Sequence, residues 1–263
     1  MITAILLVLL TMTGCEEVLH MDLNETAPKI VIEGLMTDKD PVWVKISKTQ
    51  DFYDTADFQA INTALITVKD DLGNIDTLNF KGHGLYGSDR FIGKAGRNYY
   101  LFVQAEGKEY HAQSYLPPLL PLDSVTYKKY AVFDGIHEEG YYPALYFKDP
   151  PESKNYYLLV YYKNSKLLNK RNDLQVADDE GLQQNIMGYE IPYVLQPLDT
   201  FTIKMFSMSK EVYQFYDQLS LQLINDGGSF SAPPANAKGN FSNNALGCFR
   251  TSSVQEASVV IKK

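Results

Sequence analysis

Three short stretches of the sequence bring together residue types that could do chemistry. The stretch 227–231 (GGSFS) approaches the G-x-S-x-G turn that exposes a nucleophilic serine. Its fifth residue is serine, however, and we expect a helix before it and a loop after it, where the motif needs a strand and then a helix. The stretch 137–139 (HEE) lacks the second histidine of a zinc-binding helix. The acids at 178–180 (DDE) could bind Ca²⁺, but they lack the pattern of an EF-hand loop. We therefore predict that the chain is not an enzyme and holds no metal or cofactor.

Other reactive side chains provide even weaker evidence for a metal or catalytic site. His83 and His111 are expected on different strands, and neither a cysteine nor a third histidine joins them into a zinc ligand set. Cys248 is predicted to be a small buried apolar residue. A pair of carboxylates for glycoside hydrolysis is defined by its separation in space, so no pattern selects two of the 32 acids. Glycan hydrolysis therefore stays open as an alternative.

Paired tyrosines are the remaining chemical signal, at 141–142, 156–157 and 161–162. Successive side chains of a strand point to opposite faces, so each pair puts one ring toward a core and the other outward. Outward tyrosines are enriched where proteins meet partners, and a protein or a sugar would fit such a face. Ordinary strand composition explains the same pattern, so both interpretations stand.

The first residues predict where the chain works. Residues 2–12 form a short apolar run, about half the roughly 20 residues that a membrane span needs. Its length suits a signal peptide, and Gly14 provides the small residue that cleavage requires. Since Cys15 follows, the stretch resembles a bacterial lipobox. We predict a signal peptide over 1–14, lipidation of Cys15 and a polar tether over 15–28; the alternative is a cleaved, non-lipidated signal with a cysteine there by chance.

Composition limits the partners. The chain has 263 residues, 19 of them tyrosine, with a formal net charge of −8. That charge argues against a nucleic-acid partner, because phosphate contacts need basic clusters. The two cysteines are Cys15 and Cys248. If Cys15 carries lipid, no intramolecular disulfide can form, and the fold must rely on its apolar core.

The hydropathy pattern predicts a mainly β fold with two β-sandwich-like domains. Apolar residues alternate with period two through most of 29–115, between turn signals, as in an immunoglobulin-like or transthyretin-like sandwich. Gly107-Lys108 fits a type II′ hairpin turn. Three prolines in 116–123 predict a linker. The segment 124–263 is again rich in strand residues, with an exposed excursion over 164–184. One amphipathic helix is predicted near 210–225, capped by Ser209.

Several of these features together resemble a family of Bacteroidota outer-membrane lipoproteins catalogued as domain of unknown function 4249. The features that carry the likeness are Cys15-Glu16-Glu17, Gly34, Gly84-Leu85-Tyr86, Gly96 with Tyr99 and Leu101, Asp123-Ser124-Val125, Pro234, Asn236, Gly239-Asn240, Ala245-Leu246-Gly247 and Phe249. Members look like companions of TonB-dependent outer-membrane transporters. The family offers no catalytic residue to carry over.

The resemblance implies a location and a role. We expect a lipid-anchored protein of the outer membrane, on the cell surface or the periplasmic face. We expect it to bind a small molecule or glycan as an accessory of a TonB-dependent uptake system. The alternatives are a surface glycan hydrolase and a structural or adhesive surface lipoprotein.

Overall fold

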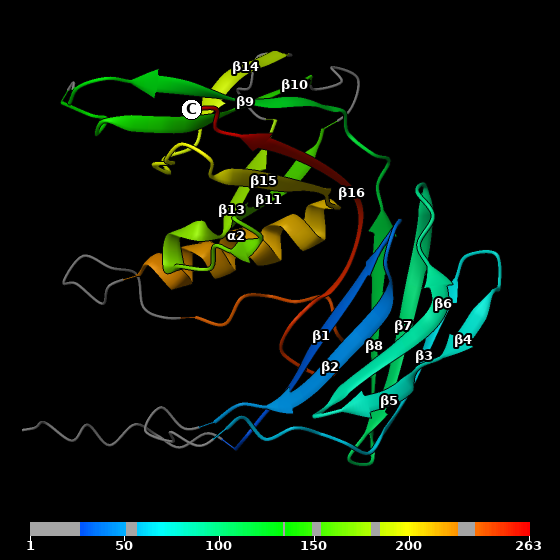
Figure 1. Ribbon diagram of the computed structural model, residues 1–263. Helices are drawn as coiled ribbons and strands as arrows, with labels where there is room; N and C mark the ends of the chain where they lie inside the picture. Colours follow the sequence, from blue (N-terminus) through cyan, green and yellow to red (C-terminus); the bar gives the residue numbers. More distant parts are fainter. Residues whose placement is uncertain (1–26, 51–56, 134, 149–153, 180–184, 226–234) are drawn as a thin grey trace, which may run out of the picture.

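The computed structural model describes residues 27–50, 57–133, 135–148, 154–179, 185–225 and 235–263 (Figure 1). The described part is mainly β and contains one α-helix, α2 (Lys210–Ile224), so the predicted fold class is confirmed. No helix within these ranges is long and apolar enough to span a bilayer.

The N-terminal half is a sandwich of two antiparallel layers. One layer contains β1 (Ile30–Thr37), β2 (Pro41–Lys48), β6 (Leu85–Ile92) and β5 (Asn79–Gly82). The other contains β4 (Ile75–Thr77), β3 (Ala64–Asp70), β7 (Arg97–Ala105) and β8 (Lys108–Leu116). Alternate residues point inward from both layers, and Ile32, Val44 and Leu101 are fully buried between them.

The turn between β7 and β8 differs from its prediction by one residue. Ala105 pairs with Lys108, so the two central residues are Glu106 and Gly107. Both have positive φ, 49° and 73°, which makes the turn type I′ and not type II′. The glycine therefore occupies the second central position.

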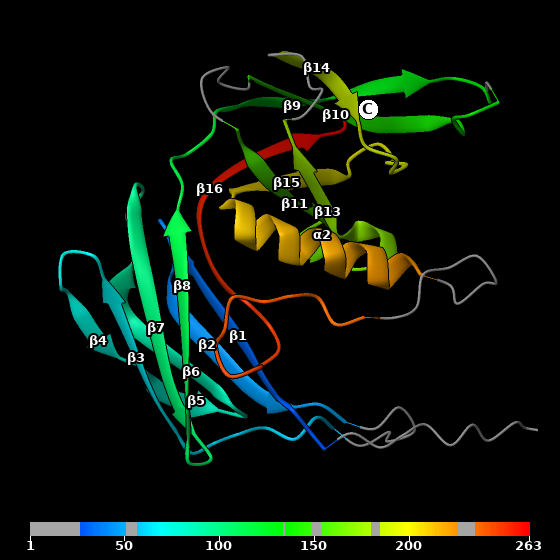
Figure 2. The ribbon, with the colours of Figure 1, turned by 180° about the vertical axis from the view of Figure 1, so that it is seen from behind.

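The C-terminal half packs a further three-stranded sheet and the helix on the other part of the nine-stranded sheet, around two cores. Its larger sheet contains β11 (Tyr156–Lys163), β12 (Lys166–Leu167), β13 (Gln175–Asp178) and β15 (Thr200–Ser207). A three-stranded sheet, β14 (Asn185–Glu190), β10 (Gly140–Lys148) and β9 (Leu122–Tyr130), covers one face, and α2 covers the other (Figures 1 and 2). The helix begins as predicted, with the Ser209 hydroxyl accepting from the Val212 amide.

The predicted exposed excursion over 164–184 is partly wrong. It contains β12, the 3-10 turn η1 (Arg171–Asp173) and β13, which pairs with β11 along Tyr156–Leu159. Residues 180–184 lie outside the described residues. The segment thus contributes a sheet edge as well as loops.

The last strand, β16 (Phe249–Val260), belongs to both halves. Phe249–Ser252 pair in parallel with Gly34–Thr37 of β1, and Ser253–Val260 pair antiparallel with β15. At this end of the chain, only the apolar residues near 259–261 have a pattern that predicts a strand. Phe249 also packs into the N-terminal core, although its place in the sequence lies within the predicted C-terminal segment 124–263. One continuous sheet therefore connects the two halves (Figure 1).

Candidate functional site

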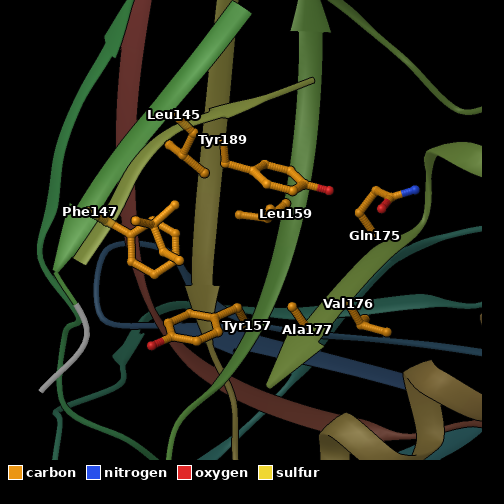
Figure 3. Close-up of a pocket in the computed structure, with 9 residues that line it drawn as sticks. Leu145, Phe147, Tyr157, Leu159, Gln175, Val176, Ala177 and Tyr189 are labelled. Carbon is orange, nitrogen blue, oxygen red and sulfur yellow. The ribbon is translucent and has the colours of Figure 1, made fainter. Parts of the chain in front are cut away.

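A cavity of about 250 Å³ lies between the three-stranded sheet and the larger C-terminal sheet. Alternation along β11 sends Tyr157 and Leu159 toward this space, while Tyr156 and Leu158 pack in the core next to α2. Figure 3 shows side chains from both walls arranged around one opening. The lining residues are Leu145, Phe147, Tyr157, Leu159, Gln175, Val176, Ala177, Ile186 and Tyr189. The lining is almost entirely apolar and aromatic.

A second cavity, of about 600 Å³, continues from the first and is more polar. Gln175 and Tyr189 line both, so the two cavities adjoin at these residues, and we call the two together the inter-sheet groove. The other residues of the polar end are Tyr161, Lys170, Arg171, Asn172, Asp173, Pro192 and Tyr193. Tyr189, at the junction of the two cavities, is 53% exposed.

A carboxylate and a phenol fix the shape of the polar end. The buried Asp173 accepts hydrogen bonds from the Tyr193 hydroxyl and, at 2.6 Å, from the Lys170 amide. The Asp173 amide in turn donates to the Lys170 carbonyl at 2.9 Å, which closes η1. Burial and then the hydrogen bond to Asp173 raise the pKa of Tyr193, so its phenol stays protonated and keeps donating.

Aromatic rings support both ends of the groove. Tyr157 meets Phe147 at a centroid distance of 5.3 Å, and Tyr161 stacks on Phe201 at 5.8 Å. Burial raises the pKa of Tyr161, which therefore stays neutral at physiological pH. Such a groove can bind a molecule with an apolar or ring-shaped body and a few hydrogen-bonding groups. Asp173 is the one carboxylate in its described lining.

Most of the candidate site residues considered in the sequence analysis lie outside the inter-sheet groove. Cys15 and the stretch 227–231 fall outside the described residues. His137 lies in the loop between β9 and β10 and is half-buried. Its Nε2 is 2.5 Å from the Glu190 carboxylate, and its ring stacks on Tyr130 at 3.8 Å. The histidine holds the end of the β9–β10 hairpin against β14.

The acids considered for Ca²⁺ are already engaged with the protein. Asp179 accepts from the Asn155 amide at 2.7 Å, and Asp178 lies 3.7 Å from the Lys154 ammonium. Glu180 is outside the described residues. Nowhere in the described ranges do three His, Cys, Asp or Glu side chains gather as a metal site.

The tyrosine pair 156–157 of β11 does not present an outward face, whereas Tyr162 of the second pair is half-buried, with the Lys204 ammonium 5.7 Å from its ring centroid. The ring of Tyr156 lies 4.9 Å from that of Tyr213 on α2, and Tyr157 and Tyr161 are buried on the opposite face. Helix α2 thus covers the face that Tyr156 was expected to present to a partner. The exposed tyrosine of the groove is Tyr189 on β14, which belongs to no pair and gave no signal in the sequence.

The described chain is thus a mainly β protein with a groove between two sheets of its C-terminal half. The family model described as "Domain of unknown function (DUF4249)" matches residues 16–258, so the chain belongs to this family. No curated protein matches the sequence significantly.

Proposed function

We propose that the protein is a non-enzymatic, lipid-anchored binding protein of the outer membrane and an accessory of a TonB-dependent uptake system. The observation that carries the binding role is the inter-sheet groove, in which an apolar end and a polar end meet at Tyr189 and Gln175. Concave sites with an apolar lining and a few placed polar groups are the usual form of small-molecule sites.

The lining indicates the class of ligand. Phe147, Tyr157 and Tyr189 offer ring surfaces for an apolar or cyclic body. At the other end, Lys170, Arg171 and Gln175 offer donors for hydroxyl, carbonyl or anionic groups. Asp173 is held by Tyr193 and by its own turn, which favours a structural role for this carboxylate. An amphipathic molecule or a short glycan with ring-shaped faces fits this arrangement.

The position of the groove suits a tethered protein. β1 begins at the end of the molecule opposite the β14-β10-β9 sheet, beside which the groove lies (Figures 1 and 2). An extended stretch from Cys15 to residue 28 would reach about 45 Å. Lipid on Cys15 would then hold the groove near a transporter and raise the local concentration of ligand there without tight affinity. The transporter as partner is inferred from the family resemblance.

Purification from membranes tests the proposal. The tagged full chain is extracted in mild detergent from producing cells that have been fed a fatty-acid probe. We expect the label on Cys15 and co-purification of a TonB-dependent transporter, and we expect a Cys15→Ser variant to lose both. Recovery of an unlabelled soluble protein would contradict the anchor, and recovery of labelled protein without a transporter would contradict the accessory role.

A further inference from the structure

An arginine at the contact between the two halves is buried without polar partners. Arg250, on β16, is 7% exposed, and neither its Nε nor its Nη1 has a hydrogen-bond partner. Across the described part of the chain, no ion pair involves its guanidinium. Buried donors are nearly always paired, so this side chain calls for an explanation.

Two aromatic rings account for the position of the guanidinium but not for its donors. Its central carbon lies 4.5 Å from the centroid of Phe206 and 5.3 Å from that of Tyr216. The faces of these rings attract the positive charge. The N–H groups point outward in the guanidinium plane, however, and ring faces do not replace the in-plane acceptors that a carboxylate would supply.

The same arginine lines a cavity of about 350 Å³ between the halves. The cavity is bounded by β1 and β2 of the N-terminal sandwich, by α2, and by the segment 236–248 that leads into β16. Its rings are Trp43, Phe215 and Tyr216, and its aliphatic side chains include Val31, Leu35 and Leu219. A buried arginine with two unpaired nitrogens therefore borders a largely apolar and aromatic cavity, distinct from the inter-sheet groove.

The other ionisable groups of the lining restrict what the cavity can accept. Glu33 is its one carboxylate among the described residues; it is exposed and forms no ion pair with Arg250. Burial raises the pKa of the Cys248 thiol to about 12, so this residue is neutral. With one cation and one carboxylate in the lining, and a net charge of −8 on the chain, multiply charged anions are disfavoured.

We propose that this cavity binds a small apolar monocarboxylate, whose carboxylate takes two hydrogen bonds from Arg250 and whose apolar body lies against Trp43, Phe215 and Leu219. Guanidinium and carboxylate match in planar geometry, which makes arginine the usual residue for this recognition. The site goes beyond the proposed function and does not depend on it.

Tryptophan fluorescence tests the site directly, because Trp43 is the chain's single tryptophan and lines the cavity. The full chain is titrated with octanoate and 4-phenylbutyrate, and separately with the uncharged octanol and 4-phenylbutanol. We expect a saturable change with at least one acid and an affinity at least tenfold weaker for the matching alcohol. Equal binding of acid and alcohol, or no saturable change with either acid, would overturn the proposal.

Variants identify the charged residue that binds the carboxylate. Arg250→Met should weaken binding of the acid at least tenfold, whereas Arg90→Met, at a side chain 83% exposed, should leave it unchanged. Glu33→Gln changes an exposed residue and should strengthen binding of the acid severalfold, because it removes a repulsive charge. This variant tests the site even if Arg250→Met does not fold. Unchanged affinity in a folded Arg250→Met, or weaker binding in Glu33→Gln, would count against the site.

Discussion

Replacing Gly247 by alanine should loosen the attachment of the C-terminal segment to β1. Gly247 has a φ of +94°, which side-chain-bearing residues rarely adopt. A Cβ atom there would lie far inside van der Waals contact of the Ile32 carbonyl oxygen. That oxygen belongs to a fully buried residue within β1, so it cannot move aside without disturbing the strand.

The expected loss in the free energy of unfolding follows from the contacts that the substitution would weaken. Alanine at positive φ costs about 1 kcal/mol. Moving the segment away also weakens two backbone hydrogen bonds, from the Ile32 amide to the Leu246 carbonyl (2.8 Å) and from the Gly34 amide to the Cys248 carbonyl (3.0 Å). Each contributes about 1 kcal/mol net. We therefore expect the free energy of unfolding to fall by about 3 kcal/mol, a large share of the roughly 5–15 kcal/mol of a typical domain.

Urea unfolding of three proteins measures this effect: the wild type, Gly247→Ala and Gly96→Ala. Gly96 is the matched control, because its φ is +81° but no atom lies within 4 Å of its Cβ position. It should lose only the conformational part, about 1 kcal/mol. If both variants lost the same free energy, the close approach to β1 would contribute nothing and the reasoning would be refuted.

Further predictions concern two ionisable groups, Asp70 and Cys248. Burial alone would raise the pKa of Asp70, but hydrogen bonds to its carboxylate and the charge of Arg97, 2.5 Å away, bring the pKa below its usual value. Asp70→Asn should lower the free energy of unfolding by about 2 kcal/mol near pH 7. The wild type should lose this advantage as the pH falls below about 4 and through the lowered pKa of Asp70. The control Asp89→Asn, at a side chain 78% exposed, should lower the free energy of unfolding by less than about 0.5 kcal/mol in the same urea titrations. Burial raises the pKa of Cys248 to about 12. Iodoacetamide at pH 8 should therefore label the folded Cys15→Ser chain far more slowly than the same chain in urea. Equal labelling rates would contradict this burial. The stability contributed by the protonated thiol should be full below about pH 8.5 and decline as the pH rises toward 12.

The alternating strands and the helix could be predicted from sequence because their patterns are local. β16 could not, because its first six residues are all buried and include the polar run Thr251–Ser253. That run is accommodated by partners far away in the chain: the Thr251 hydroxyl donates to that of Ser114 at 2.9 Å. A polar, non-alternating strand carries no period-two signal.

Several residues that carry the family resemblance gather where the C-terminal segment meets β1. The Asn240 side chain bonds both the amide and the carbonyl of Phe249 at 2.8 Å, and Phe249 packs closely over Gly34. These residues therefore join the halves and were not recognisable as such from sequence. The inter-sheet groove was hidden for another reason: its walls look like ordinary core strands, and only their separation in space leaves the cavity open.

Photocrosslinking from position 189 in cells tests the central claim, that the inter-sheet groove binds a ligand, most directly. A photoreactive phenylalanine replaces Tyr189, and intact-protein mass spectrometry identifies what becomes attached. The same residue at Leu72, 73% exposed in the turn before β4, is the control for non-specific capture. The account predicts a discrete small-molecule adduct at 189 that is absent at 72 and is lost when Ala177→Phe fills the groove. No adduct at 189, or the same adducts at both positions, would contradict it.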